Sequence, residues 1–223
     1  MYRTIAASQD GVIREVERAL GTSPAPLMVV KRSHDSVGAS LAEPGPRRVL
    51  VPLDGSEHAE SALPHVVDLL QRLYPEGAEV LLFRVVDTSD VDLAAGSASA
   101  LAFDPRASLN VAALYLQDVS RRLRRAVGAP HTYMVGVGIG VPDLLLPGTA
   151  RADGVELVVL TTHGAGGHAE PRLGSVARET LRRSGVPVLV VTPPHLRTGR
   201  AHDGEHRHAT LLPVAETQYA MAA

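Results

Sequence analysis

The chain has 223 residues, of which 45% are hydrophobic, and this is enough for one compact domain with extensions. Its formal net charge of -2, with no long basic run, argues against a nucleic-acid-binding protein, and the absence of cysteine excludes disulfides and thiolate metal sites. No apolar stretch approaches the roughly 18 residues of a membrane helix. The N-terminal MYRTIAASQDG lacks the apolar segment of a secretory signal. We therefore expect a cytoplasmic protein without a membrane partner.

Residues 1–46 are predicted to be a helix–strand extension followed by a linker. The segment GVIREVERALGTSPAPLMVVKR resembles the chain's own GSVARETLRRSGVPVLVVTP: each has an arginine-rich amphipathic helix, a turn and a valine-rich strand after proline. Two interpretations remain open. The extension is the remnant of a second copy, or the similarity is one that any helix–turn–strand sequence would give.

Residues 47–194 are predicted to form one α/β domain, and residues 195–223 a disordered tail. Because the strands are apolar throughout and alternate with helices, the pattern predicts a doubly wound, five-stranded parallel sheet covered by helices on both faces. Residues 87–107 are small and polar and are predicted to be a long loop, either an insertion or a lid. The predicted strands are 47–53, 78–86, 131–137, 155–160 and 186–192, and the predicted helices are 58–74, 109–127, 142–152 and 174–184.

The strand order decides where a ligand would bind. Doubly wound sheets bind ligands beyond the carboxyl ends of the strands, where the order reverses. With right-handed crossovers and the order 3-2-1-4-5, the reversal lies between the first and fourth strands. Asp54 leaves the first strand and Thr161 leaves the fourth. We expect Asp54 to face the glycine-rich loop of residues 161–175 across one crevice.

That loop, TTHGAGGHAEPRLGS, has the composition of a phosphate-binding loop. Glycines let backbone N–H groups approach phosphate oxygens, and Gly174-Ser175 opens a helix whose N-terminus attracts anions. The loop contains no lysine, so it is not a G-x-x-x-x-G-K-[ST] motif. The alternative is that these residues only shape a strand-to-helix connection and its cap.

The segments VLVPLDGSEHAESAL, GVPDLLLPGTAR and THGAGGHAEPRLGSVARETLRRSGVPVLVV resemble the universal stress proteins over about residues 47–192. Nucleotide-binding members of that family carry G-x-x-G, nine residues and G-[ST]. Gly164 and Gly174-Ser175 fit this spacing, whereas Thr161 stands at the first glycine. The resemblance implies an adenine nucleotide alpha hydrolase-like fold, bound ATP or another adenine nucleotide, with or without Mg²⁺, and a homodimer that pairs through the last strand. The nucleotide-binding residues that it implies are Pro52, Asp54, Val85, Thr161, His163, Gly164, Gly174, Ser175 and Val176.

Three functions remain open. The first is an ATP-binding regulatory module of the stress response, with slow hydrolysis at most. The second is an interaction or dimerisation domain whose crevice is closed by Thr161. The third is a hydrolase that uses Asp54 and His163, although no nucleophile-elbow motif accompanies Ser175. Asp54 has the alternative role of capping the following helix.

Two expectations concern the ends of the chain. The apolar strand 186–192 would be an adhesive sheet edge if unpaired, so we expect the strand at residues 25–31 to pair with it, within the chain or in a partner subunit. The tail histidines could bind a metal ion, but their spacing implies no closed ligand set, and no metal site is predicted. These residues are His195, His202, His206 and His208.

Overall fold

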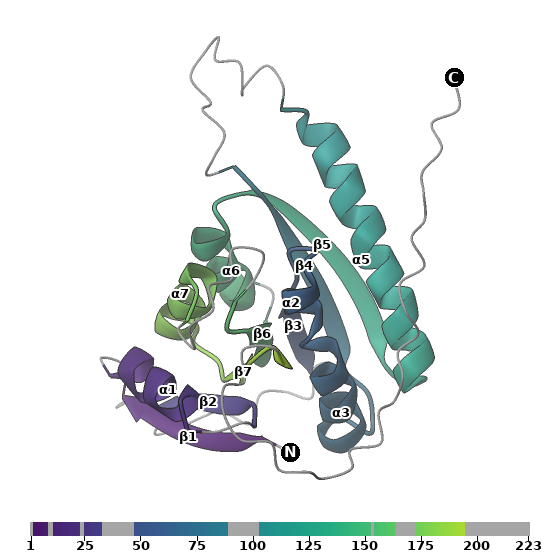
Figure 1. Cartoon of the computed structure of the whole chain (residues 1–223). Coiled ribbons are helices and arrows are strands. Elements are labelled where there is room, and N and C mark those ends of the chain that lie inside the picture. The colour runs from purple at the N-terminus through teal and green to yellow at the C-terminus, as the bar shows by residue number, and fades with distance from the viewer. Residues whose placement is uncertain are drawn as a thin grey trace, which may run out of the picture.

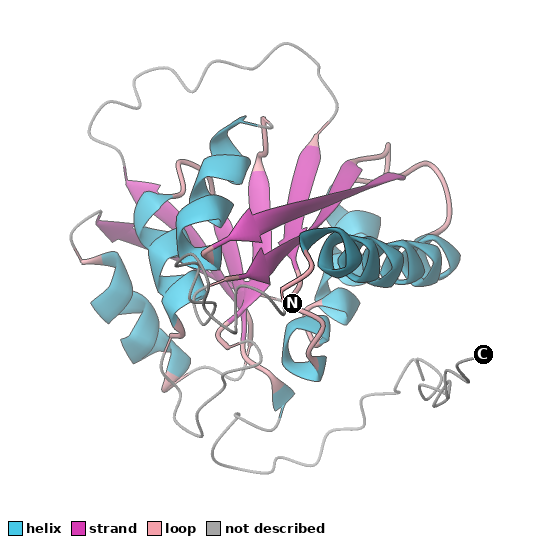
Figure 2. Ribbon diagram, turned by 90° about the horizontal axis from the view of Figure 1, so that it is seen from above, coloured by secondary structure: helices cyan, strands magenta, loops and turns pink. Residues whose placement is uncertain are grey.

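A computed structural model of the protein describes residues 2–8, 11–22, 25–32, 47–88, 103–152, 154–163 and 173–194. These residues form a seven-stranded sheet with helices on both faces (Figures 1 and 2). The strands are β1 (Arg3–Ser8), β2 (Leu27–Arg32), β3 (Arg48–Pro52), β4 (Glu79–Asp87), β5 (Thr132–Gly140), β6 (Leu157–Thr161) and β7 (Val188–Val191). The helices are α1 (Val12–Leu20), α2 (Glu57–Glu60), α3 (Leu63–Leu73), α5 (Pro105–Val127), α6 (Pro142–Ala152) and α7 (Ser175–Arg183).

The five predicted parallel strands are confirmed in the predicted order. The sheet reads β1-β2-β7-β6-β3-β4-β5, so the order 3-2-1-4-5 corresponds to β5-β4-β3-β6-β7. All five residues of β6 are buried, as an apolar strand covered on both faces requires. One core lies between the sheet and α3 and α5, and the other lies between the sheet and α1 and α7.

The N-terminal extension contains a strand that was not predicted. β1 lies parallel to β2, and α1 connects them, so the extension is a strand–helix–strand unit and not a helix and strand alone. β1 escaped prediction because its sequence RTIAAS has few branched apolar residues, and only Ala7 is fully buried. The linker of residues 33–46 lies outside the described residues.

β2 joins this unit to the rest of the sheet. It pairs antiparallel with β7, with Leu27 opposite Val190 and Val29 opposite Val188. The predicted pairing of the two segments is confirmed within one chain. The edge of β7 through which a homodimer was expected to form is therefore occupied by β2.

Several element boundaries differ from prediction. The helix predicted at 58–74 is divided into α2 and α3, because Pro64 in the first turn of α3 has no N–H to continue a helix from before it. α5 starts at Pro105, since the Asp104 carboxylate accepts hydrogen bonds from the backbone N–H groups of Arg106 and Ala107. The last residues of the predicted loop 87–107 thus belong to α5, and its centre, residues 89–102, lies outside the described residues, as does the tail from residue 195.

β5 extends three residues beyond its predicted end. Two glycines of this strand lie close to neighbouring side chains: a Cβ at Gly136 would lie 2.7 Å from the ring of Phe83 in β4, and one at Gly140 would lie 3.1 Å from Leu145. Only glycine lets these side chains lie against the backbone of β5.

Candidate functional site

The turn after β3 carries the first of the predicted site residues, Asp54. The Oδ1 atom of this exposed residue accepts hydrogen bonds from the Ser56 N–H at 2.9 Å and the Ser56 hydroxyl at 2.6 Å. Ser56 Oγ in turn accepts from the Ala59 N–H at 3.1 Å and caps α2. Asp54 therefore supports the cap of the following helix, and its carboxylate is held at the carboxyl end of β3.

Gly55 in the same turn lies against a residue that the sequence reasoning missed. Its φ of +91° is a conformation that favours glycine, and a Cβ there would lie 3.0 Å from a guanidinium nitrogen of Arg84. The Arg84 guanidinium also lies 5.2 Å from the centre of the Tyr115 ring in α5. The available signal was a charged residue, Arg84, inside the apolar run between the terminal Glu79 and Asp87 of the strand EVLLFRVVD.

The end of β6 is buried and linked to the start of α7. The Thr161 hydroxyl donates to the carbonyl oxygen of His163 at 2.6 Å, and His163 Nδ1 lies 3.2 Å from the Thr162 hydroxyl. The Gly174 N–H donates to the Thr162 carbonyl oxygen at 2.8 Å. A Cβ at Gly174 would lie 3.2 Å from that same oxygen, so the close approach depends on glycine at this position.

Helix α7 begins directly after this contact. Gly174 is its N-cap residue and makes no side-chain capping bond, so the predicted cap function of this segment is carried by the backbone alone. Ser175 is exposed at the first position of the helix, and Val176 follows it. The exposed Ser175 hydroxyl and the N-terminal end of a nine-residue helix thus lie beside the end of β6.

The predicted site residues gather at one edge of the sheet. β3 lies between β4 and β6, and all three strands are parallel, so their carboxyl ends meet at the same edge. Pro52 and Asp54 come from β3, Val85 from β4, and Thr161 and His163 from β6. Gly174, Ser175 and Val176 come from the start of α7, whereas Gly164 lies outside the described residues.

Charged groups line this edge on the side of α2 and α5. Arg122 forms an ion pair with Glu60 at 2.9 Å, and the hydrogen bond that the guanidinium donates to Glu60 raises the pKa of Arg122. Burial, followed by the charge of Glu60, raises the pKa of Tyr115 far above its ordinary value, and the charge of Asp54 adds to this increase. The Tyr115 phenol therefore stays protonated and neutral beside the turn.

Within the described ranges there is neither a cluster of metal-ligating side chains nor a membrane-spanning helix. No three or more histidine, aspartate or glutamate side chains gather there in a way that could hold a metal ion. The tail histidines considered above lie outside those ranges. In the part of the chain that the structure describes, no helix has both the length and the apolarity needed to cross a membrane.

Known proteins share this architecture. The universal stress protein family model matches residues 45–192. A universal stress protein of Methanocaldococcus jannaschii is 28% identical over an alignment of 167 residues, and the match covers 65% of this chain and 94% of that protein. The structure of the universal stress protein UspA from Lactobacillus plantarum is 26% identical, with a TM-score of 0.51, and the match covers 65% of this chain and 97% of that one.

A universal stress protein from Archaeoglobus fulgidus shares the fold over a longer part of this chain. The match covers 85% of this chain but only 60% of that one, at 22% identity and a TM-score of 0.50. The residues matched by the family model make up well over half of the chain and include all five parallel strands from β3 to β7. The chain therefore belongs to the universal stress protein family.

Proposed function

We propose that this protein is a regulatory module of the stress response that binds ATP or another adenine nucleotide at the carboxyl ends of β3, β4 and β6. The observation that carries the proposal is the convergence of Asp54 with the start of α7 at this edge. The hydrogen bond from Gly174 to Thr162 holds the helix start beside the end of β6. The carboxylate of Asp54, a hydrogen-bond acceptor, follows β3, and the start of α7, which attracts anions, lies beside the end of β6. β3 and β6 are adjacent strands at the switch point of a doubly wound sheet.

Each part of the edge has a role in this proposal. The Asp54 carboxylate accepts hydrogen bonds from ribose hydroxyls or the adenine amine, while Pro52 and Val85 border the base. Backbone N–H groups at Ser175 and Val176 face the phosphates, and Gly174, whose own N–H is bonded to Thr162, holds them in place. Mg²⁺ would offset the repulsion between Asp54 and the phosphates. Thr161, His163 and Gly164 complete the surroundings of the ribose and phosphates.

The side chain of Thr161 bears on the alternative of an empty crevice. Thr161 is only 8% exposed, and its hydroxyl is hydrogen-bonded to the carbonyl oxygen of His163. This bond commits the side chain to the backbone of its own segment and supports an open crevice. If the alternative held, a Thr161→Gly variant would bind nucleotide and the unaltered chain would not.

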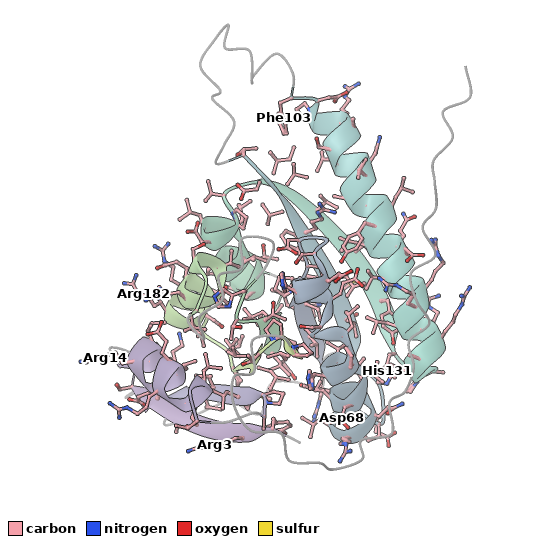
Figure 3. All side chains as sticks on the ribbon, viewed as in Figure 1. Arg3, Arg14, Asp68, Phe103, His131 and Arg182 are labelled. Carbon is pink, nitrogen blue, oxygen red and sulfur yellow. The ribbon has the colours of Figure 1, made fainter. Side chains whose placement is uncertain are left out.

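Isothermal titration with ATP and Mg²⁺ tests the proposal. We expect saturable binding by the unaltered chain and at least tenfold weaker binding by Asp54→Ala, because the variant loses the acceptor. Asp68→Ala is the matched control, because it removes a carboxylate of α3 that is not among the proposed site residues. In Figure 3 Asp68 lies at the opposite end of the sheet from Phe103, which precedes α5. Absence of heat at millimolar ATP with a folded protein would overturn the proposal.

Hydrolysis of ATP is at most slow in this proposal. His163 is 7% exposed and interacts with the Thr162 hydroxyl, a contact that fits a structural role as well as a catalytic one. We expect phosphate release measured with His163→Ala to equal that of the unaltered chain, and a marked loss would favour a hydrolase. The proposal places the protein in the cytoplasm and does not include a dimer through β7, since β2 occupies that edge.

A further inference from the structure

Two strand–helix–strand units face each other across the junction of β2 and β7. In each unit the two strands are parallel and one helix connects them: β1–α1–β2 in the first, β6–α7–β7 in the second. The units meet through the antiparallel pair of β2 and β7. Both helices lie on the same face of the sheet, where Arg178 of α7 forms an ion pair with Glu17 of α1 at 3.0 Å (Figure 1). The units are thus related by an approximate two-fold axis perpendicular to the sheet.

The two-fold relation between the units does not extend beyond the outer edge of β1. The equivalent strand, β6, pairs on its far side with β3 in a parallel ladder, whereas β1 pairs only with β2 among the described residues. The Arg3 N–H donates to the carbonyl oxygen of Pro26 just before β2, so Arg3, Ile5 and Ala7 direct their backbone groups toward β2. The backbone groups of the alternate residues, including Ala6, are directed outward.

One face of the first unit is also uncovered. Ile5, Ala7 and Val29 pack against α1, but Thr4, Ala6 and Ser8 on the opposite face are exposed, and Val30 beside them is 38% exposed. On the equivalent face of the second unit, α3 packs against Leu189 and Val191 of β7.

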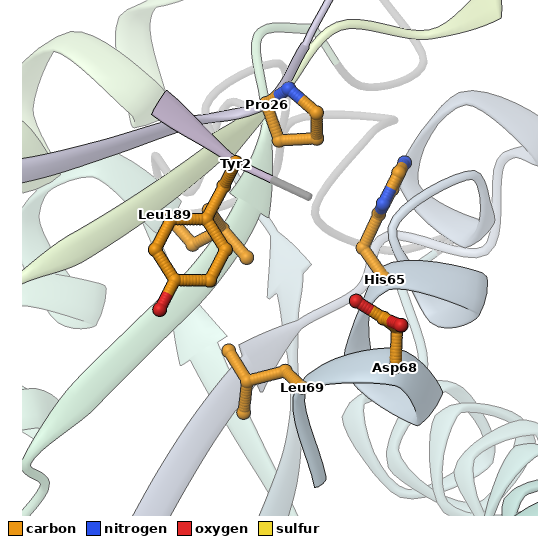
Figure 4. A pocket seen from close by; sticks show the side chains of 6 residues that line it. All are labelled: Tyr2, Pro26, His65, Asp68, Leu69 and Leu189. Carbon is orange, nitrogen blue, oxygen red and sulfur yellow. The ribbon is translucent and has the colours of Figure 1, made fainter. Parts of the chain in front are cut away.

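α3 covers β7 but not the first unit, and a shallow hollow lies at the boundary between them (Figure 4). The hollow is lined by His65, Asp68 and Leu69 of α3, by Leu189 of β7, and by Tyr2 and Pro26 beside β1 and β2. A helix equivalent to α3 would sit beyond the hollow, over the exposed Val30 and next to Met28, which is already buried. No described helix occupies that place.

From these observations we infer that the outer edge and uncovered face of β1–β2 form a docking site for a strand–helix segment of a partner polypeptide. Its strand is apolar and runs parallel to β1, and its helix is amphipathic and covers Val30 and Ala6. The segment has the chemistry of residues 48–73, which fill the equivalent position beside β6.

A synthetic peptide with the sequence of residues 47–77 is the probe, because that segment already fits the equivalent edge of β6. Fluorescence anisotropy of the labelled peptide with the full chain measures binding. We expect saturable binding that weakens at least tenfold with Ala6→Pro. The proline removes an N–H that points outward, and it leaves the hydrogen bonds between β1 and β2 in place. Ala6→Lys keeps the backbone but places a charge on the uncovered face, and we expect a similar loss.

Val135→Pro is the matched control. β5 is the other outermost strand, and because the Thr132 N–H donates to Ala78, the odd-numbered residues of β5 direct their N–H groups outward. A proline there alters a free edge that the proposal does not use, so peptide binding should be unchanged. A peptide carrying Val51→Asp should bind more weakly, since its strand would bury a charge.

Hydrogen exchange locates the peptide. We expect it to slow the amides of Thr4, Ala6 and Ser8 and to leave those of β3 protected. Absence of binding, protection confined to β5, or exchange of the peptide with the chain's own β3 would overturn the proposal. A chain dimer in sedimentation velocity that Ala6→Pro dissolves would also overturn it, because the occupant would then be a second copy.

Discussion

Gly55 links the conformation of the proposed nucleotide site to a cross-strand contact. Its positive φ turns the chain between Asp54 and Ser56, and the Arg84 guanidinium packs where a side chain would begin. The two constraints act together, since a larger residue would both strain the backbone and displace Arg84 from the Tyr115 ring.

A Gly55→Ala variant should lower the free energy of unfolding by about 1 to 2 kcal/mol or more, through backbone strain alone. The displacement of Arg84 adds to this loss. Gly185→Ala is the matched control, because no atom lies within 4 Å of a Cβ at that exposed position and its φ is not positive. Urea unfolding of both variants compares them, and equal midpoints would contradict the prediction.

Tyr115 gives the protein a pH dependence on the alkaline side. Burial and the charge of Glu60 raise the pKa of the folded phenol above its ordinary value of 10.0. The unfolded chain therefore loses this proton first, so the contribution to stability is complete below about pH 10 and declines as pH rises further.

We expect Tyr115→Phe to reduce the fall in unfolding free energy between about pH 9 and 11, measured by urea titration at each pH. Tyr74 and Tyr133 have pKa values raised mainly by burial too, so part of the fall should remain. If the slopes of the variant and the unaltered chain coincided, Tyr115 would not contribute in this way.

Among the separate elements, α5 shows how a short signal sets a helix boundary. The Asp104 carboxylate accepts the N–H groups at the start of this helix, and Pro105 occupies its first turn, where a missing N–H costs nothing. The apolar periodicity begins only four residues later, so a prediction based on periodicity alone started the helix too late.

Replacement of Asp104 by alanine should cost about 1 kcal/mol of stability, because two backbone N–H groups lose their acceptor. Asp104→Asn, which keeps a side-chain oxygen, should retain most of it. The measurement is urea unfolding followed by circular dichroism, and equal loss in both variants would show that the charge, and not the cap, is what matters.

The first unit and the family domain are joined into a single structural body. They share a sheet through β2 and β7, and one core contains Val16 of α1, Val29 of β2, Leu181 of α7 and Val190 of β7. The ion pair between Glu17 and Arg178 adds a surface contact of small value. Shared burial of this kind favours cooperative unfolding of both parts.

We expect Val16→Ala to lower the unfolding free energy of the entire chain by about 2 kcal/mol, since Val16 is fully buried. Val30→Ala is the control, because Val30 is 38% exposed and loses little burial. Native-state hydrogen exchange should show β2 and β6 opening with the same free energy. Separate opening of β1–β2, with only that step affected by Val16→Ala, would contradict this expectation.

Most of the fold followed from local pattern. β3, β4, β6 and β7 each contain an apolar run that is buried, whereas the edge strand β5 is only partly buried. The handedness of the crossovers restricted the order of the five strands. The placement of Asp54 and Thr161 on adjacent strands followed from that order. The similarity of residues 11–32 to the C-terminal element likewise indicated a strand able to pair with β7.

The remainder depended on contacts between residues distant in sequence. β1 has little apolar pattern, because one of its faces is uncovered, and it is defined by its ladder with β2. The role of Arg84 comes from its approach to Gly55 across two strands. Whether β2 pairs within the chain or between chains could not be read from residues 25–31, since both arrangements use the same strand pattern. Apolar periodicity reports how a segment is buried, whereas only the folded arrangement fixes which segment buries it.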